Sequence, residues 1–153
     1  MTTLRAVSVK DLAEFVDEPI MASVLVLGPG SIDAMRARDR RGLGRGLRAE
    51  RRSNAEFQEI APLRTTSTGL NGGLLLLTAD ELVLLAVRAR FVGHLATDVI
   101  GRRELEQIDA VSFDVESGRL RITFLDHPRW EFDVVRRNRA DAQILAAMLQ
   151  GAA

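Results

Sequence analysis

The second half of the chain constrains the fold most strongly, because short apolar segments follow one another there and end in one amphipathic helix. The helix is predicted over residues 138–149, with Asn138 as its N-cap and Asp141 in its first turn. Its apolar stripe is expected to consist of Ile144, Leu145, Met148 and Leu149. This order predicts a mainly β (α+β) fold, in which a curled antiparallel sheet is capped by a C-terminal amphipathic helix.

Two segments before the helix alternate cleanly between apolar and polar residues. The residues expected to face inward are Leu120, Ile122, Phe124, Trp130, Phe132 and Val134. Period-two alternation indicates antiparallel strands with one solvated face. The outer charges are expected to pair across the sheet, Arg121 with Glu131 or with Asp133. The same alternation favours a core position for Trp130 over a ligand platform.

Apolar segments also precede this region. Residues 74–78 and 82–87 predict a hairpin with the polar loop Ala79-Asp80-Glu81, and both strands are expected to be covered on two faces. The strand at residues 20–27 and the terminal helix are the candidates to cover them. Residues 94–101 predict a weaker strand, which Gly101-Arg102-Arg103 is expected to interrupt before the apolar pattern resumes.

The N-terminal part predicts a short helix and one strand. Ser8 to Asp11 has the form of a capping box, so a helix is expected over residues 9–16, packed through Leu12, Phe15 and Val16. Residues 20–27 read IMASVLVL, which is typical of a buried strand. We therefore expect a single domain over residues 1–153. Its parts are an N-terminal helix (1–19), a strand (20–27), an Arg-rich insert (31–56) and the core (73–150).

The Arg-rich insert is the one strongly charged stretch. Residues 36–52 hold eight arginines against Asp39 and Glu50, a net charge of +6. The glycines at 42, 44 and 46 each weaken a helix by about 1 kcal/mol. The insert is either a basic arm that binds phosphate or a solvated loop, and without interleaved aromatic residues nucleic acid is disfavoured. The candidate anion-binding residues are Arg36, Arg38, Arg40, Arg41, Arg45, Arg48, Arg51 and Arg52.

Composition and motifs point away from an enzyme. The net charge is zero and there is no cysteine, which excludes disulfides and thiolate metal sites. Neither a G-x-S-x-G nor a P-loop motif occurs, and the spacing of His94 and His127 does not suit a metal site. We therefore expect no catalytic residue, no metal and no cofactor. The N-terminus lacks an apolar h-region and no apolar run could span a bilayer, so a cytoplasmic location is expected.

Several of these segments resemble bacterial pleckstrin-homology-like (PH/GRAM-type) domains. GLLLLTADELVLL at 73–85 resembles their opening hairpin, and Arg103-Glu104-Leu105 followed by Ile108 to Val111 resembles their central step. LRITFLDHPRWEFDVV and NRADAQILAAML resemble the closing hairpin and capping helix. The resemblance covers about residues 73–149, with residues 20–27 as an extra or first strand. It implies a seven-stranded, two-sheet curled barrel that serves as a scaffold for lipid headgroups, peptides or its own copies.

Two functions follow as hypotheses. The first is a non-enzymatic interaction module that binds a protein partner or itself through exposed strand edges. The alternative is peripheral binding to anionic phospholipid headgroups at the inner face of the membrane, through the Arg-rich insert. Phosphoinositide-binding members of the family carry basic residues in the first hairpin loop. The loop Ala79-Asp80-Glu81 is acidic, but the first loop becomes the Arg-rich insert if residues 20–27 form the first strand.

Overall fold

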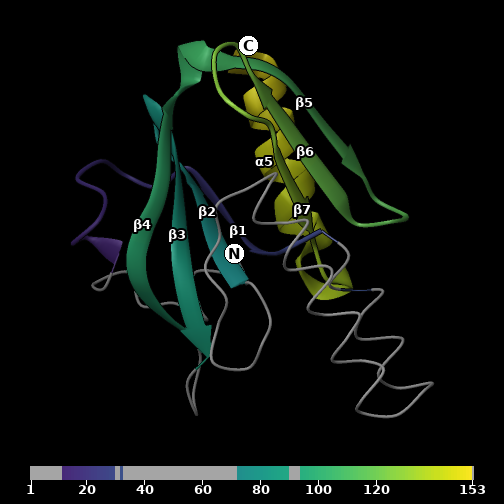
Figure 1. Cartoon of the computed structure of the whole chain (residues 1–153), viewed down its shortest axis with the longest axis horizontal. Coiled ribbons are helices and arrows are strands. Elements are labelled where there is room, and N and C mark those ends of the chain that lie inside the picture. Colours follow the sequence, from purple (N-terminus) through teal and green to yellow (C-terminus); the bar gives the residue numbers. More distant parts are fainter. Residues whose placement is uncertain (1–11, 30–31, 33–71, 90–93, 153) are drawn as a thin grey trace.

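The computed structural model describes residues 12–29, 32, 72–89 and 94–152. Within these ranges, seven strands form one sheet in the order β4-β3-β2-β1-β7-β6-β5, and the helix α5 follows the last strand (Figure 1). The bounds are β1 Ala22–Leu27, β2 Gly72–Leu77, β3 Glu81–Ala89, β4 His94–Glu104, η1 Leu105–Gln107, β5 Ile108–Asp114, β6 Arg119–Phe124, β7 Trp130–Asp133, η2 Arg136–Asn138 and α5 Arg139–Ala152.

Strand β1 occupies the middle of the sheet and joins its two halves. It pairs antiparallel with β2 along its whole length, ending at Leu27↔Gly72, and with β7 through Leu27↔Asp133. The remaining strands form two antiparallel meanders, β2-β3-β4 on one side and β7-β6-β5 on the other. The segment predicted at residues 20–27 is therefore the first strand of this sheet. It lies beside the β2–β3 hairpin and does not cover it.

The expected two-sheet barrel is wrong in two respects. The seven strands form a single sheet, because β1 pairs with both β2 and β7 and so continues the ladder between the two halves. The sheet is also not closed: the end strands β4 and β5 are connected by η1 but share no ladder. Figure 1 shows the sheet curling so that β4 and β5 lie on opposite sides of the fold. The coarser prediction of a mainly β fold with a C-terminal helix is confirmed.

The concave side of the sheet holds the main core. Its members are the inward residues Ala22, Val24, Val26, Leu75, Leu77, Leu82, Leu84, Ile108, Leu120, Ile122, Phe124, Trp130, Phe132 and Val134, with Ala142, Leu145, Ala146 and Leu149 of α5. The helix contacts β1 and β5 and thereby fills this side. The predicted helix stripe was partly wrong, because Ile144 is 50% exposed. At 100° per residue, Ile144 lies opposite the face that positions 142, 145, 146 and 149 share.

The outer face of β2 and β3 carries a second apolar cluster. It comprises Leu12, Val16, Leu74, Leu76, Val83, Leu85, Val87 and Ala96, with Phe15, Ile20 and Leu25 packed against them. The prediction that both strands are covered on two sides is confirmed, with the main core on one side and the N-terminal segment on the other. The amides of Phe15 and Val16 both donate to the carbonyl of Leu12. The capping box at residues 8–11 lies outside the described residues.

Two strand predictions had different outcomes. The hairpin at 74–87 is confirmed, and Thr78 Oγ1 accepts from the amides of Asp80 and Glu81 in its loop. The break at residues 101–103 is wrong, because Gly101 and Arg103 continue the β3–β4 ladder opposite Leu84 and Leu82. The irregularity lies earlier, where the register with β3 shifts at two points. Such bulges bend a strand without ending it.

Candidate functional site

The eight predicted anion-binding arginines, from Arg36 to Arg52, lie outside the described residues. The structure does place the two ends of the segment that contains them. Leu27 ends β1, Gly72 begins β2, and the two residues are paired neighbours. The Arg-rich insert is therefore the connection between the first two strands of the sheet, and it departs from and returns to the same end of the sheet.

A polar groove lies near that end, on the outer face of β5–β7. Its volume is about 560 Å³. The amide of Ile32, just beyond β1, donates to Asp133 Oδ2 at 3.2 Å and so holds the start of the insert against β7. The described lining residues are Ile32, Ser112, Phe113, Asp114, Glu116, Ser117, Arg119, Arg121 and Asp133.

Two nearly buried carboxylates fix the arginines of this groove. Glu131 and Asp133 are only 3% and 4% exposed, although they lie on the outer face. Arg121 donates to Glu131 Oε1 from Nε and Nη2 at 2.8 and 2.6 Å, which confirms one of the two predicted pairings. Asp133 instead accepts from Arg119 Nε at 2.9 Å, because Arg119 lies opposite it in the register. Both guanidinium groups are therefore held in fixed positions.

The β5–β6 turn forms the other wall of the groove and is held from within. Asp114 Oδ1 accepts from the amides of Glu116 and Ser117 at 2.9 and 3.4 Å. These bonds, with one from the Ser117 hydroxyl, hold the pKa of Asp114 below its ordinary value of 3.8. Arg139 of α5 adds bonds to the carbonyls of Glu116 and Val134. The turn is therefore a rigid wall.

A second polar group lies inside the curled sheet. Arg103 extends from β4 across the concave side, and its guanidinium carbon lies 5.1 Å from the ring centroid of Trp130 and 5.4 Å from that of Phe124. The sequence pattern did not single out Arg103, because a break was predicted at residues 101–103. A signal was present: if β4 continues, period two places Arg103 on the same face as Gly101, opposite the inward residues of β3.

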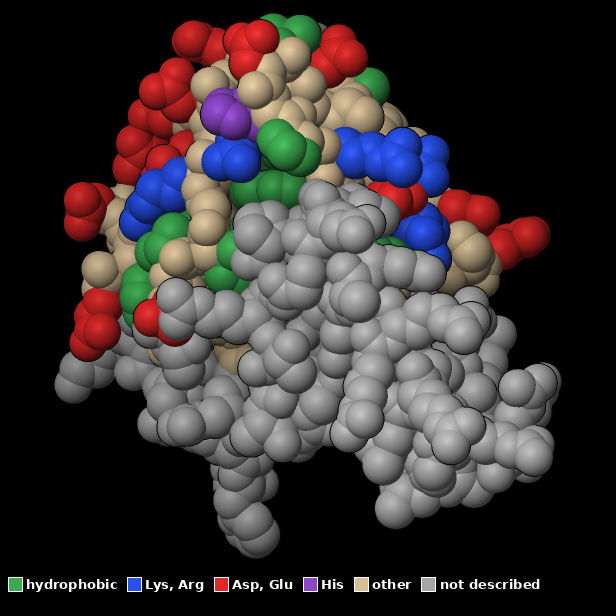
Figure 2. Space-filling view, viewed as in Figure 1, with side chains coloured by type: hydrophobic (Ala, Val, Ile, Leu, Met, Phe, Trp, Pro, Cys, Tyr) green, Lys and Arg blue, Asp and Glu red, His purple; other side chains and the backbone are tan. Residues whose placement is uncertain are grey.

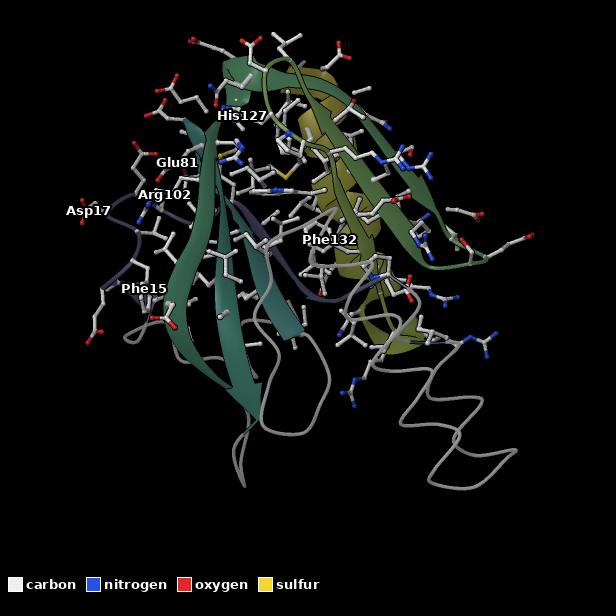
Figure 3. All side chains as sticks on the ribbon, viewed as in Figure 1. Phe15, Asp17, Glu81, Arg102, His127 and Phe132 are labelled. Atoms are coloured by element: carbon white, nitrogen blue, oxygen red, sulfur yellow. The ribbon has the colours of Figure 1, made fainter. Side chains whose placement is uncertain are left out.

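A third group lies where the N-terminal segment meets the β2–β3 turn. Arg102 donates to the carbonyl of Phe15 and, at 2.6 Å, to Glu81 Oε1, so it lies between them (Figure 3). A hydrogen bond with the Asp80 carboxyl raises the pKa of Glu18 above its ordinary value of 4.5. Carboxyl groups this close disfavour each other's ionised forms. The protonation of Glu18 is therefore linked to the contact between the N-terminal segment and the β2–β3 turn.

The described histidine side chain belongs to the β6–β7 loop. His127 Nε2 lies 3.4 Å from Gln107 Nε2 of η1. In the part of the chain that the structure describes, no three His, Asp or Glu side chains come together as a metal site would require. Nor does any helix there have the length and apolar character needed to cross a bilayer. No protein-family model matches this chain, and no curated protein matches it either.

Proposed function

We propose that this chain is a non-enzymatic PH-like interaction module that binds a protein partner or a second copy of itself. The strand order supports the PH-like interpretation, because two meanders meet at β1 and β7 and a C-terminal helix fills the concave side. The open seam departs from the barrel that the resemblance implies.

The observation that carries the proposal is the edge strand β5. It ends the sheet order and, among the described strands, pairs only with β6. Its residues are largely exposed, and Val111 and Phe113 are half-buried against the core. Gln150 of α5 donates to the Val111 carbonyl at 3.1 Å, so an added strand would have to displace this side chain. An edge strand can accept an added strand through its backbone groups, with side-chain contacts giving specificity. A partner segment, or β5 of a second copy, can extend the sheet there.

Two lysines placed on β5 test this proposal. Ala110→Lys with Ser112→Lys puts charge at exposed positions of the edge, where lysine opposes strand addition. The matched control places lysines at the exposed Gln143 and Ala147 of α5. We expect light scattering or co-purification from the native host to show an assembly that the β5 lysines abolish and the α5 lysines retain. A wild-type protein that remains a bare monomer would contradict the proposal.

A second candidate function is peripheral attachment to anionic membranes, and one observation favours it. Because β1 is the first strand of the sheet, the stretch with a net charge of +6 connects the first two strands, where lipid-binding PH-like domains are basic. Each arginine near an anionic surface contributes about 1 kcal/mol.

Vesicle co-sedimentation tests the second candidate. We expect binding to phosphatidylserine vesicles but not to phosphatidylcholine vesicles, with loss at high salt. Replacing the eight insert arginines by serine should abolish binding. Replacing Arg119 and Arg121 of β6 and Arg129 of the β6–β7 loop should leave vesicle binding unchanged. A wild-type protein that stays in the supernatant would exclude membrane attachment.

A further inference from the structure

Arg103 is held in an aromatic setting on the concave side of the curled sheet. Its guanidinium lies over Trp130 and Phe124, whose rings contact each other edge to face with centroids 4.9 Å apart. The close approach of strand β4 to the Trp130 ring depends on Gly101, since a Cβ atom at this residue would lie 2.9 Å from the ring. Cation–π contacts of this kind attract a guanidinium but leave its N–H donors free.

The donors of Arg103 are incompletely used. Nη1 donates to the carbonyl of Arg102 at 2.8 Å, whereas Nε is buried and has no hydrogen-bond partner. No carboxylate among the described residues pairs with Arg103, in contrast to Arg102, Arg119 and Arg121. Burial lowers the pKa of Arg103, yet a guanidinium stays protonated in proteins. Within the described ranges, Arg103 is thus a partly desolvated cation without a paired anion, which is an arrangement that calls for an explanation.

Packing alone does not supply that explanation. Replacing a poorly compensated buried charge by an apolar side chain of similar volume is often neutral or stabilising. Methionine would fill the same space over Trp130 without the cost of desolvating a charge. Retaining arginine at such a position is typical of a group that meets an anion supplied from outside.

The surroundings of the guanidinium define what can reach it. Arg103 lies two residues before the start of η1, and Phe124 and Trp130 flank the β6–β7 loop. These two segments are joined by a bond from the Leu125 amide to the Gln107 carbonyl at 2.9 Å. Leu125, next to Phe124 in the chain, is 63% exposed and offers an apolar contact on the surface.

Acidic side chains are exposed in the segments that adjoin Arg103 and Phe124. Figure 2 shows them gathered around the end of the molecule that carries His127. Three exposed acidic residues lie close to Arg103 or Phe124 in the sequence: Glu104, Glu106 and Asp126. These carboxylates repel a dianionic phosphate or a run of acidic residues more strongly than they repel a single carboxylate, because repulsion grows with the charge of the ligand. One positive charge within an acidic rim suits one negative charge.

We infer that Arg103 is the receptor for a single carboxylate of the protein partner, carried by an acidic residue between apolar neighbours. This inference rests on the proposed interaction function and adds the chemistry of the partner. The carboxylate forms charge-assisted hydrogen bonds with the guanidinium. The apolar neighbours contact Leu125 and the rim of the aromatic cluster.

Trp130 provides the readout, because it is the only tryptophan of the chain and lies directly beneath Arg103. The probes are the blocked tripeptides Leu-Glu-Leu and Leu-Gln-Leu, and inorganic phosphate. We expect the Glu tripeptide to change Trp130 fluorescence saturably. The affinity of the Gln tripeptide should be lower by a factor on the order of ten or more. Equal responses to the two tripeptides, or a tighter response to phosphate, would overturn the inference.

Arg103→Met is the decisive variant, with Arg129→Met as its matched control. Arg129 is an exposed arginine that adjoins Trp130 in the sequence. We expect Arg103→Met to lose the fluorescence response to the Glu tripeptide, while its midpoint of urea denaturation stays equal to or above that of the wild type. Arg129→Met should respond to the tripeptide as the wild type does. A lowered midpoint with an unchanged tripeptide affinity would make Arg103 structural and sink the inference.

The β5 lysine variant separates this inference from the proposed function. If the assembly is lost with the β5 lysines but persists in Arg103→Met, the interaction function stands and the carboxylate receptor is wrong. If no assembly forms at all while the tripeptide response depends on Arg103, the receptor stands without the β5 interface. Loss of the assembly in both variants supports both.

Discussion

Trp130 is the residue on which both halves of the sheet converge. It comes from β7, contacts Phe124 and Phe132 edge to face, and lies under Arg103 of β4. Only 1% of its surface is exposed. Aromatic pairs of this geometry contribute about 0.5–1.5 kcal/mol beyond the area they bury. One side chain therefore connects, through the core, strands that the backbone ladder leaves far apart.

We expect Trp130→Ala to lower the free energy of unfolding by about 3–5 kcal/mol, because it removes a large buried ring and leaves a cavity. Urea denaturation measures the loss. Leu125→Ala is the control, since Leu125 is 63% exposed and its loss should change stability by less than ~0.5 kcal/mol. A loss below ~1 kcal/mol for Trp130→Ala would be inconsistent with a core position.

The stability that Asp114 contributes through the β5–β6 turn depends on pH. Because its folded pKa lies below 3.8, the ionised carboxylate contributes stability above that pH, and the contribution is lost as the pH falls through the folded pKa. We expect Asp114→Asn to unfold at a lower temperature than the wild type at neutral pH and to converge with it under strongly acid conditions. Asp126→Asn controls for the loss of one exposed carboxylate. Parallel curves for the wild type and Asp114→Asn over the whole range would refute the role.

At the scale of elements, the β5–β6 turn depends on one glycine. Gly118 has φ +76°, and a Cβ there would lie 2.5 Å from the Val134 carbonyl oxygen. We expect Gly118→Ala to destabilise the fold by ~1–3 kcal/mol. Gly151→Ala is the control, because nothing lies within 4 Å of its Cβ position in α5. It should leave stability unchanged or raise it by up to ~1 kcal/mol. Thermal unfolding distinguishes the two, and equal effects would contradict the account of the turn.

The N-terminal segment gives a pH response of the opposite sign. The folded pKa of Glu18 is raised, so the stability that its proton contributes is present below pH 4.5 and is lost as the pH rises through the folded pKa. Glu18→Gln cannot ionise. We expect this variant to be more stable than the wild type at neutral pH and equal to it in acid. Hydrogen exchange of the Phe15 and Val16 amides, corrected for intrinsic rates, should show the same trend. Equal protection at every pH would argue against the carboxyl contact.

Elements with one solvated face were predictable, and the others were less so. Strand β6 alternates between buried and more exposed residues, as predicted. The outer carboxylates of β7 were expected to meet water but are nearly buried, because arginines pair with them. The pairing of Arg121 with Glu131 still followed from the alternation. In β4 the pattern fails, because bulges shift its register and Arg103 points inward over aromatic rings. In α5 the apolar residues alone did not distinguish Ile144, which is exposed, from Leu145, which is buried. Which of the two is buried depends on the side of the helix that faces the sheet, and the sequence of the helix does not specify that side.

At the scale of the whole molecule, the pairing of distant strands lies beyond local patterns. The bond ladder between β1 and β7 rests on Leu27↔Asp133, residues near opposite ends of the chain. Nothing within either segment specifies this partner, so a single open sheet could not be told from two sheets. The candidate sites divide in the same way. The charge run of the insert is visible in sequence, whereas Arg103 becomes notable only once β4, β6 and β7 face one another.

The central place of β1 also has a consequence for the order of folding. Short loops close four of the hairpins, β2–β3, β3–β4, β5–β6 and β6–β7. Pairing β1 with β2 closes a long connection and pairing it with β7 a still longer one, at a greater cost in chain entropy. We therefore expect pulsed hydrogen exchange to find Val24 of β1 protected later than Leu84 of β3, and the reverse order would contradict this. Until β1 docks, the chain is two half-sheets with exposed apolar faces. That interval is when the newly made protein is most prone to aggregate.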